Sequence, residues 1–136
     1  MANLSITADD VHIVRATDNE LLTAPAGEAG NAGQYFRLNT TTGKLEKGNA
    51  TTTTELGNTY GILIETVAVG QTATIALPGA LVDVGDALDA LAFDAPVYVS
   101  DTDATLADSA GTVSRVFGRV EPGFASTTAD KLLRVK

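Results

Sequence analysis

The sequence predicts an all-β fold, either a small β-barrel or a β-sandwich, and three observations lead to this prediction. Thr, Val, Gly, Asp and Ala are abundant while Lys, Glu, Gln and Met are scarce, which favours strands and turns over helices. Short segments that alternate between apolar and polar residues are separated by turn-forming residues. Finally, one strand–turn–strand unit occurs twice, and such a repeat determines the architecture.

The two copies of this unit are residues 34–45 (QYFRLNTTTGKL) and residues 95–106 (APVYVSDTDATL). Segments on both sides of them also correspond. We therefore predict one β domain over residues 21–136, made of repeats at about 21–78 and 79–136, with an N-terminal arm and first strand in residues 1–20. The matched pairs are Phe36 with Val97, Leu38 with Val99, Leu45 with Leu106, Tyr60-Gly61 with Phe117-Gly118, residues 27–29 with 85–87, and residues 75–77 with 133–135.

In the first repeat, polar and Gly-rich segments mark the ends of the strands. Residues 17–20 predict a turn, and Gly43 suits the left-handed position that closes a hairpin loop. Residues 47–57 are polar and unpatterned, which predicts an exposed loop. We expect the apolar strand at 59–67 to be central in its sheet. The strands predicted in this half of the chain are 9–15, 21–23, 34–38, 44–46, 59–67 and 72–77.

In the second repeat, a helix competes with a strand at one place only. Apolar residues recur at helical spacing over residues 80–91, but Gly85 and several Asp residues weaken that helix. We expect an extended segment with at most one short helix near residues 86–91. Gly118 interrupts an apolar strand and predicts a bulge or a close approach of two backbones. The later strands are predicted at 96–100, 105–107, 113–120 and 130–136.

A chain of 136 residues has the size of one domain and buries roughly two-thirds of its unfolded surface. Because Trp is absent and aromatic residues are few, we expect all of them to be large pieces of the interior. These residues are Tyr35, Phe36, Tyr60, Phe93, Tyr98, Phe117 and Phe124. We place Phe36, Ile62, Tyr98, Leu106 and Val120 in the core.

The formal net charge of −8 argues against a nucleic-acid partner, since phosphate contacts need clustered Lys and Arg. We also expect no membrane partner and no signal peptide, because no segment is apolar enough for either. Acidic residues gather between residues 83 and 108, and basic residues gather between 115 and 136. This polarity favours head-to-tail contact between copies, or simply a solvated surface that keeps the protein soluble.

Residues for catalysis or metal binding are few. The chain has no Cys, and His12 is its one imidazole, so thiolate and imidazole metal sites are excluded and a surface or packing role suits His12 better than catalysis. Asp101 and Asp103 resemble the start of a calcium loop, yet Leu106 and Thr112 stand where that loop needs Gly and Glu. A weak calcium site there competes with a plain β-turn. We expect no enzyme activity and no cofactor.

Several short motifs occur in a distinctive order from about residue 24 to the C-terminus: PAGEA at 25–29, AGQ at 32–34, TGKL at 42–45, YGI at 60–62, APVYVSDT at 95–102 and GRV at 118–120. In this order they resemble the small head-decoration, or capsid cement, proteins of tailed bacteriophages. The resemblance implies a compact β subunit that forms a homotrimer and binds the major capsid protein on the outer surface of the virion. It implies no catalytic residue, and it places the protein in the host cytoplasm during assembly.

We therefore expect a structural virion protein that stabilises an assembled phage capsid. The alternative is a carbohydrate- or receptor-binding β module on a virion or cell surface. The N-terminal arm, which is a candidate to become ordered on binding, and the Gly-rich run at 27–33 are the expected contacts with the shell or with other copies. The Thr-rich loop at 51–54 is expected on the outer face. The predicted contact residues are Asn3, Leu4, Ile6, Asp9, Asp10, Gly27, Gly30 and Gly33.

Overall fold

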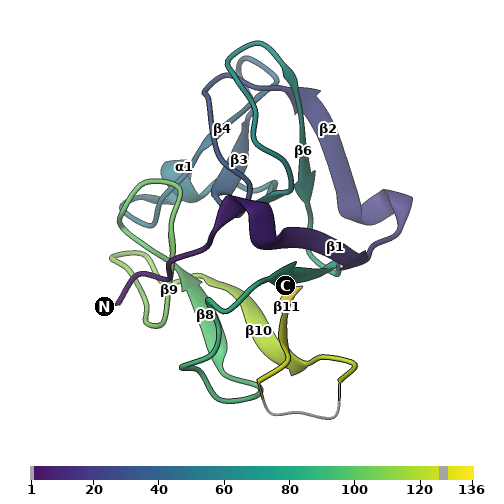
Figure 1. The fold of residues 1–136 in the computed structure, drawn as a ribbon. Coiled ribbons are helices and arrows are strands. Elements are labelled where there is room, and N and C mark those ends of the chain that lie inside the picture. The colour runs from purple at the N-terminus through teal and green to yellow at the C-terminus, as the bar shows by residue number, and fades with distance from the viewer. Residues whose placement is uncertain (1, 126–128) are drawn as a thin grey trace.

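The computed structural model, which describes residues 2–125 and 129–136, contains two antiparallel β-sheets and confirms the all-β prediction (Figure 1). The sheets form a sandwich-like arrangement and not a closed barrel. The five-stranded sheet has the order β2 (Leu21–Pro25), β6 (Thr72–Ala76), β5 (Tyr60–Leu63), β3 (Tyr35–Asn39), β4 (Lys44–Lys47). The six-stranded sheet has the order β1 (Val11–Arg15), β7 (Leu81–Val84), β11 (Lys131–Val135), β10 (Val116–Pro122), β8 (Pro96–Val99), β9 (Leu106–Ala107).

Each half of the chain builds one sheet, and both halves use the same strand order. The order β2-β6-β5-β3-β4 in the first half becomes β7-β11-β10-β8-β9 in the second when each strand is replaced by its counterpart. Strand β1 adds a sixth strand at the edge of the second sheet. Two copies of one folded unit would produce this common order.

The register of the strands also corresponds between the two sheets. Hairpin β3–β4 pairs Leu38 with Leu45, and hairpin β8–β9 pairs Val99 with Leu106. The left-handed position predicted at Gly43 is present, with φ of 72°, and Ala104 at the corresponding place has φ of 56°. Other corresponding pairs are Phe36–Gly61 with Val97–Gly118, and Leu63–Ile75 with Val120–Leu133.

The short helix lies at a different place from the one we predicted. Residues 85–90 form turns, because Gly85 adopts φ of 70° and ends β7. Helix α1 (Thr53–Leu56) lies instead in the predicted polar loop. It forms there because the Thr52 side chain accepts a hydrogen bond from the Glu55 amide and Gly57 ends the helix with φ of 73°. Two 3-10 turns, η1 (Ala8–Asp10) and η2 (Asp18–Glu20), flank β1.

Two apolar clusters form the interior. The larger one joins both sheets and includes Ile62 from β5, Leu106 from β9 and Val120 from β10. The smaller one lies on the other face of the five-stranded sheet and contains Phe36. That sheet curls, since the segment after β2 forms a parallel bridge from Ala26 to β4. The predicted burial of these four core residues is confirmed.

Four of the seven aromatic residues are not fully buried, contrary to our prediction. One of them, Tyr60, is half-buried and packs against the larger core. Tyr98 is only half-buried, because Val97 and Val99 beside it take the inward positions of β8 and successive side chains alternate between faces. Phe93 is 41% exposed and Phe124 is 72% exposed, both in connections between strands. The interior therefore depends more on aliphatic residues than we expected.

A half-buried arginine, Arg115, connects the two repeats. The Arg115 guanidinium donates hydrogen bonds to the carbonyl oxygens of Leu56 (3.2 Å) and Gly57 (2.6 Å), at the end of α1, and lies 4.5 Å from the centre of the Tyr60 ring. The Tyr35 hydroxyl donates to the same Leu56 carbonyl oxygen. Burial raises the pKa of Tyr35 to about 12. Arg115 thus holds the connection that precedes β10 against the first repeat.

Candidate functional site

The N-terminal arm, residues 2–10, lies along the edge of β9 and extends the six-stranded sheet. The Leu4 amide donates to the Leu106 carbonyl oxygen at 2.8 Å, and the Asp108 amide donates to the Ala2 carbonyl oxygen at 3.0 Å. Asn3 forms an isolated bridge with Ala107. The arm then leads into β1 at the opposite edge of the same sheet (Figure 1).

Side chains of the arm alternate between the protein and the solvent. Leu4 and Ile6 are partly buried against the larger core, whereas Ser5 between them is exposed. The exposed Asn3 side chain also donates to the Thr102 hydroxyl (3.0 Å) and accepts from the buried Ser100 hydroxyl (2.7 Å). One face of the arm therefore packs on the domain and the other faces outward.

The predicted contact glycines serve contacts within the chain. Gly30 is buried and exchanges two backbone hydrogen bonds with Val67, of 3.0 and 2.9 Å. Gly33 is buried with φ of 93°, and a β-carbon there would collide with Ile6. Gly27 is half-buried and donates to the Leu45 carbonyl oxygen at 2.8 Å. The lack of side chains thus allows close packing inside the domain.

The structure brings together only part of the predicted contact set. Leu4, Ile6 and Gly33 line a concavity of about 250 Å³ between the arm and the segment that precedes β3. Asp9 and Asp10 are exposed in η1, and Asp10 packs against Gly85. The Thr-rich stretch at 51–54 is exposed, as the sequence predicts.

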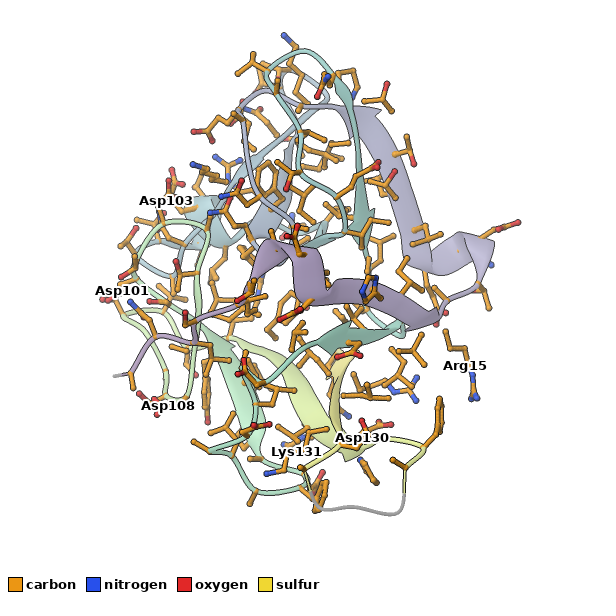
Figure 2. The ribbon with its side chains drawn as sticks, in the orientation of Figure 1. Arg15, Asp101, Asp103, Asp108, Asp130 and Lys131 are labelled. Atoms are coloured by element: carbon orange, nitrogen blue, oxygen red, sulfur yellow. The ribbon has the colours of Figure 1, made fainter. Side chains whose placement is uncertain are left out.

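Three aspartates lie on the side of the molecule opposite Arg15, but each has its own partner (Figure 2). Asp101 accepts hydrogen bonds from the amide (2.8 Å) and the hydroxyl (2.7 Å) of Thr112. Asp103 accepts from the Asn49 amide group at 3.3 Å, and Asp108 accepts from the backbone amide of Ala2 at 3.0 Å. Among the described residues, no three His, Cys, Asp or Glu side chains gather in a way that could hold a metal ion.

The basic residues near the C-terminus are largely bonded within the chain. Arg119 donates to the Asp94 carbonyl oxygen, and Lys131 donates to the carbonyl oxygens of Asp89 and Leu91. Arg134 forms a two-pronged ion pair with Glu121, with distances of 2.9 and 3.1 Å. Some of the basic side chains near the C-terminus therefore hold loops in place through hydrogen bonds to backbone carbonyl oxygens. His12 is exposed on β1.

The Asp101–Thr112 contact predicts a loss of stability in acid. The backbone hydrogen bond from Thr112, with the hydroxyl bond added, lowers the pKa of Asp101 from its usual 3.8. A carboxylate with a lowered folded-state pKa stabilises the fold above its unfolded pKa, and this contribution disappears as pH falls through the folded pKa. We therefore expect urea midpoints to fall as the pH drops below about 4.

Replacing Asp101 with asparagine tests this prediction, because Asn keeps one acceptor oxygen but does not titrate. Asp101→Asn should reduce the acid-induced fall in the urea midpoint. Part of the fall that remains should come from Glu121, whose pKa is lowered by its ion pair with Arg134. Asp103→Asn serves as the matched control, since within the described part of the chain this loop carboxylate accepts one hydrogen bond, of 3.3 Å, from Asn49. An Asp101→Asn protein with the wild-type pH profile would contradict the prediction.

The sequence analysis missed a second concavity, between hairpin β3–β4 and α1. Arg37, Thr40, Thr53 and Asn58 are among the residues that line it. The two Thr-rich stretches at 40–42 and 51–54 were the available signal, but only the fold shows that they face each other.

Comparison with protein-family models, curated proteins and solved structures found no match. Within residues 2–125 and 129–136, no helix has the length and apolar character needed to cross a membrane.

Proposed function

We propose that this protein is a structural virion component that binds the outer surface of an assembled phage capsid as a homotrimer and stabilises the shell. The support is the ordered set of motifs from PAGEA at 25–29 to GRV at 118–120, which resembles capsid decoration proteins. The duplicated β architecture and the arm suit a protein whose surface contacts neighbours.

The arm is the observation that carries this proposal. Because the Leu4 amide points toward β9, the backbone amide and carbonyl of Ser5 point to the outer edge by the alternation of extended chains. Ser5 is exposed and its amide makes no backbone hydrogen bond within the described part of the chain. An open edge of this kind can accept an extended segment of another protein by strand addition.

The physical effect on the shell is mass action. A protein that binds the assembled lattice but not its free subunits stabilises the lattice by about 2.7 kcal/mol per site at a hundredfold excess over the dissociation constant. A shell offers many such sites, so a modest contact at each one adds up to substantial resistance against disassembly.

The test is a binding experiment with shells that lack this protein, assembled from the major capsid protein of the same phage. The wild-type protein should pellet with the shells, raise their disassembly temperature, and show three times the mass of one chain in light scattering. A protein that stays monomeric at high concentration and does not pellet with such shells would overturn the proposal.

The variant Ser5→Pro tests the role of the arm, because proline removes the outward amide donor. We expect it to weaken shell binding by at least about tenfold, the loss of roughly 1.4 kcal/mol. Ser5→Ala is the matched control, which keeps the backbone donor and should bind like the wild type. If Ser5→Pro binds equally well, the arm is not the contact edge.

A further inference from the structure

The concavity between hairpin β3–β4 and α1 has a volume of about 480 Å³, within the usual range of small-molecule sites. It lies at the end of the five-stranded sheet where α1 packs beside β3 and β4 (Figure 1). Residues from two connections that are distant in sequence form it. We call it the threonine groove, and the residues that matter are Arg37, Thr40, Thr41, Thr53, Thr54 and Asn58.

Most polar side chains of the threonine groove have unused hydrogen-bonding capacity. None of the hydroxyls of its four threonines, and neither polar atom of the Asn58 side chain, takes part in a hydrogen bond among the described residues. Asn39 beside them is different, because its oxygen accepts from the amides of Thr41 and Thr42 and its nitrogen donates to Glu46. The groove thus gathers uncharged groups that can each donate and accept.

The second repeat closes the corresponding groove. Asp101 stands at the position equivalent to Thr40, and its carboxylate binds the backbone amide and hydroxyl of Thr112 across the gap. Thr102, equivalent to Thr41, accepts from Asn3. The connection between β9 and β10 has eight residues, whereas the one between β4 and β5 has twelve and contains α1. The two repeats therefore differ here: the groove is open in the first repeat and closed in the second.

The charge around the groove excludes a simple anion site. The Arg37 guanidinium lies 3.7 Å from Glu46 and 3.8 Å from Glu55, so two carboxylates oppose the single positive charge. The formal charge of −8 on the whole chain also repels anions. These charges disfavour an anion, and the free hydroxyls and the Asn58 amide suit a ligand that is rich in hydroxyl groups.

We propose that the threonine groove binds a neutral saccharide. Sugar hydroxyls both donate and accept, as threonine hydroxyls and the asparagine amide do, and the threonine methyls with Leu38 offer a small apolar surface for a ring face. Because no aromatic side chain lines the groove, single sites bind weakly, with dissociation constants on the order of millimolar. Display of many copies on one particle would convert weak sites into firm attachment. The site itself does not depend on the proposed capsid role.

The experiment is an NMR titration of the ¹⁵N-labelled full chain with methyl α-mannoside, maltotriose and triacetylchitotriose, each tested separately, and with sulfate. At least one saccharide should produce saturable amide shifts confined to residues 37–41 and 53–58, while sulfate should produce none there. The proposal is overturned if no saccharide causes saturable shifts, if the shifts lie elsewhere, or if sulfate alone moves these amides.

Removing two hydroxyls without changing shape gives a second test. Thr53→Val/Thr54→Val should weaken saccharide binding at least about fivefold, because two hydrogen bonds are lost. The same spectra show whether the variant is folded. Thr52 is not changed, because its side chain caps α1. Thr72→Val, at an exposed threonine of β6, is the matched control and should bind normally. Equal binding by the double variant and the control would contradict the assignment.

Discussion

Replacing Phe36 with alanine should lower the free energy of unfolding by about 3–5 kcal/mol, the usual cost of removing a buried phenylalanine ring. Phe36 is fully buried in the smaller cluster, where it packs with Leu45 and Leu63. Its ring also lies against Gly30, where a side chain of any size would collide with it. Leu45 and Leu63 stand on strands that are paired within the sheet, so the cavity cannot collapse easily and the cost should fall in the upper part of this range.

Chemical denaturation in urea measures this cost, provided that the slope of free energy against urea concentration is unchanged. Phe93→Ala is the matched control, since that ring is 41% exposed and the Lys131 ammonium lies 5.4 Å from its centre. The control should lose less than about 1 kcal/mol. A loss below about 1 kcal/mol for Phe36→Ala would show that the smaller cluster contributes little to stability.

The strands of both repeats could be predicted because local chemistry specifies them. Gly43 closes one hairpin, and alternating residues in β8 fix which side chains point inward. The same alternation gives the half-buried position of Tyr98. The repeat aligns Tyr98 with Arg37, and a position that accepts a charged, half-buried residue in one copy is a poor candidate for the core in the other.

Helix α1 could not be predicted from periodicity, because four residues are too few to show it. Its formation depends on the cap at Thr52 and the left-handed Gly57. Contacts that join distant segments are also invisible to local patterns. The pairing of Leu4 with Leu106 and the meeting of Thr40 with Thr53 across the threonine groove both require the completed fold. Predictions about the arm and the groove therefore needed the structure, whereas those about strands did not.

Gly61→Ala and Gly118→Ala should each destabilise the protein by about 1–3 kcal/mol or more, and by similar amounts. The two glycines occupy the same place in the two repeats, where Gly61 of β5 pairs with Phe36 of β3 and Gly118 of β10 pairs with Val97 of β8. A β-carbon at Gly61 would lie inside the contact distance of the Ala76 carbonyl oxygen, and one at Gly118 would do the same to Arg134. Because these oxygens belong to the backbone of central strands, no side-chain rotation can relieve the clash.

Gly43→Ala separates this clash from the general cost of losing glycine. A β-carbon there meets nothing within 4 Å, but φ of 72° strains any other residue, so we expect a cost of about 1 kcal/mol. Hydrogen exchange locates the damage, which should weaken protection in β5 and β6 for Gly61→Ala and in β10 and β11 for Gly118→Ala. If the two repeats are copies of one unit, the two variants should lose similar stability, and each loss should be confined to the equivalent strands. A large loss of stability in one variant with none in the other would mean that the two glycines contribute differently to stability, despite the shared strand order.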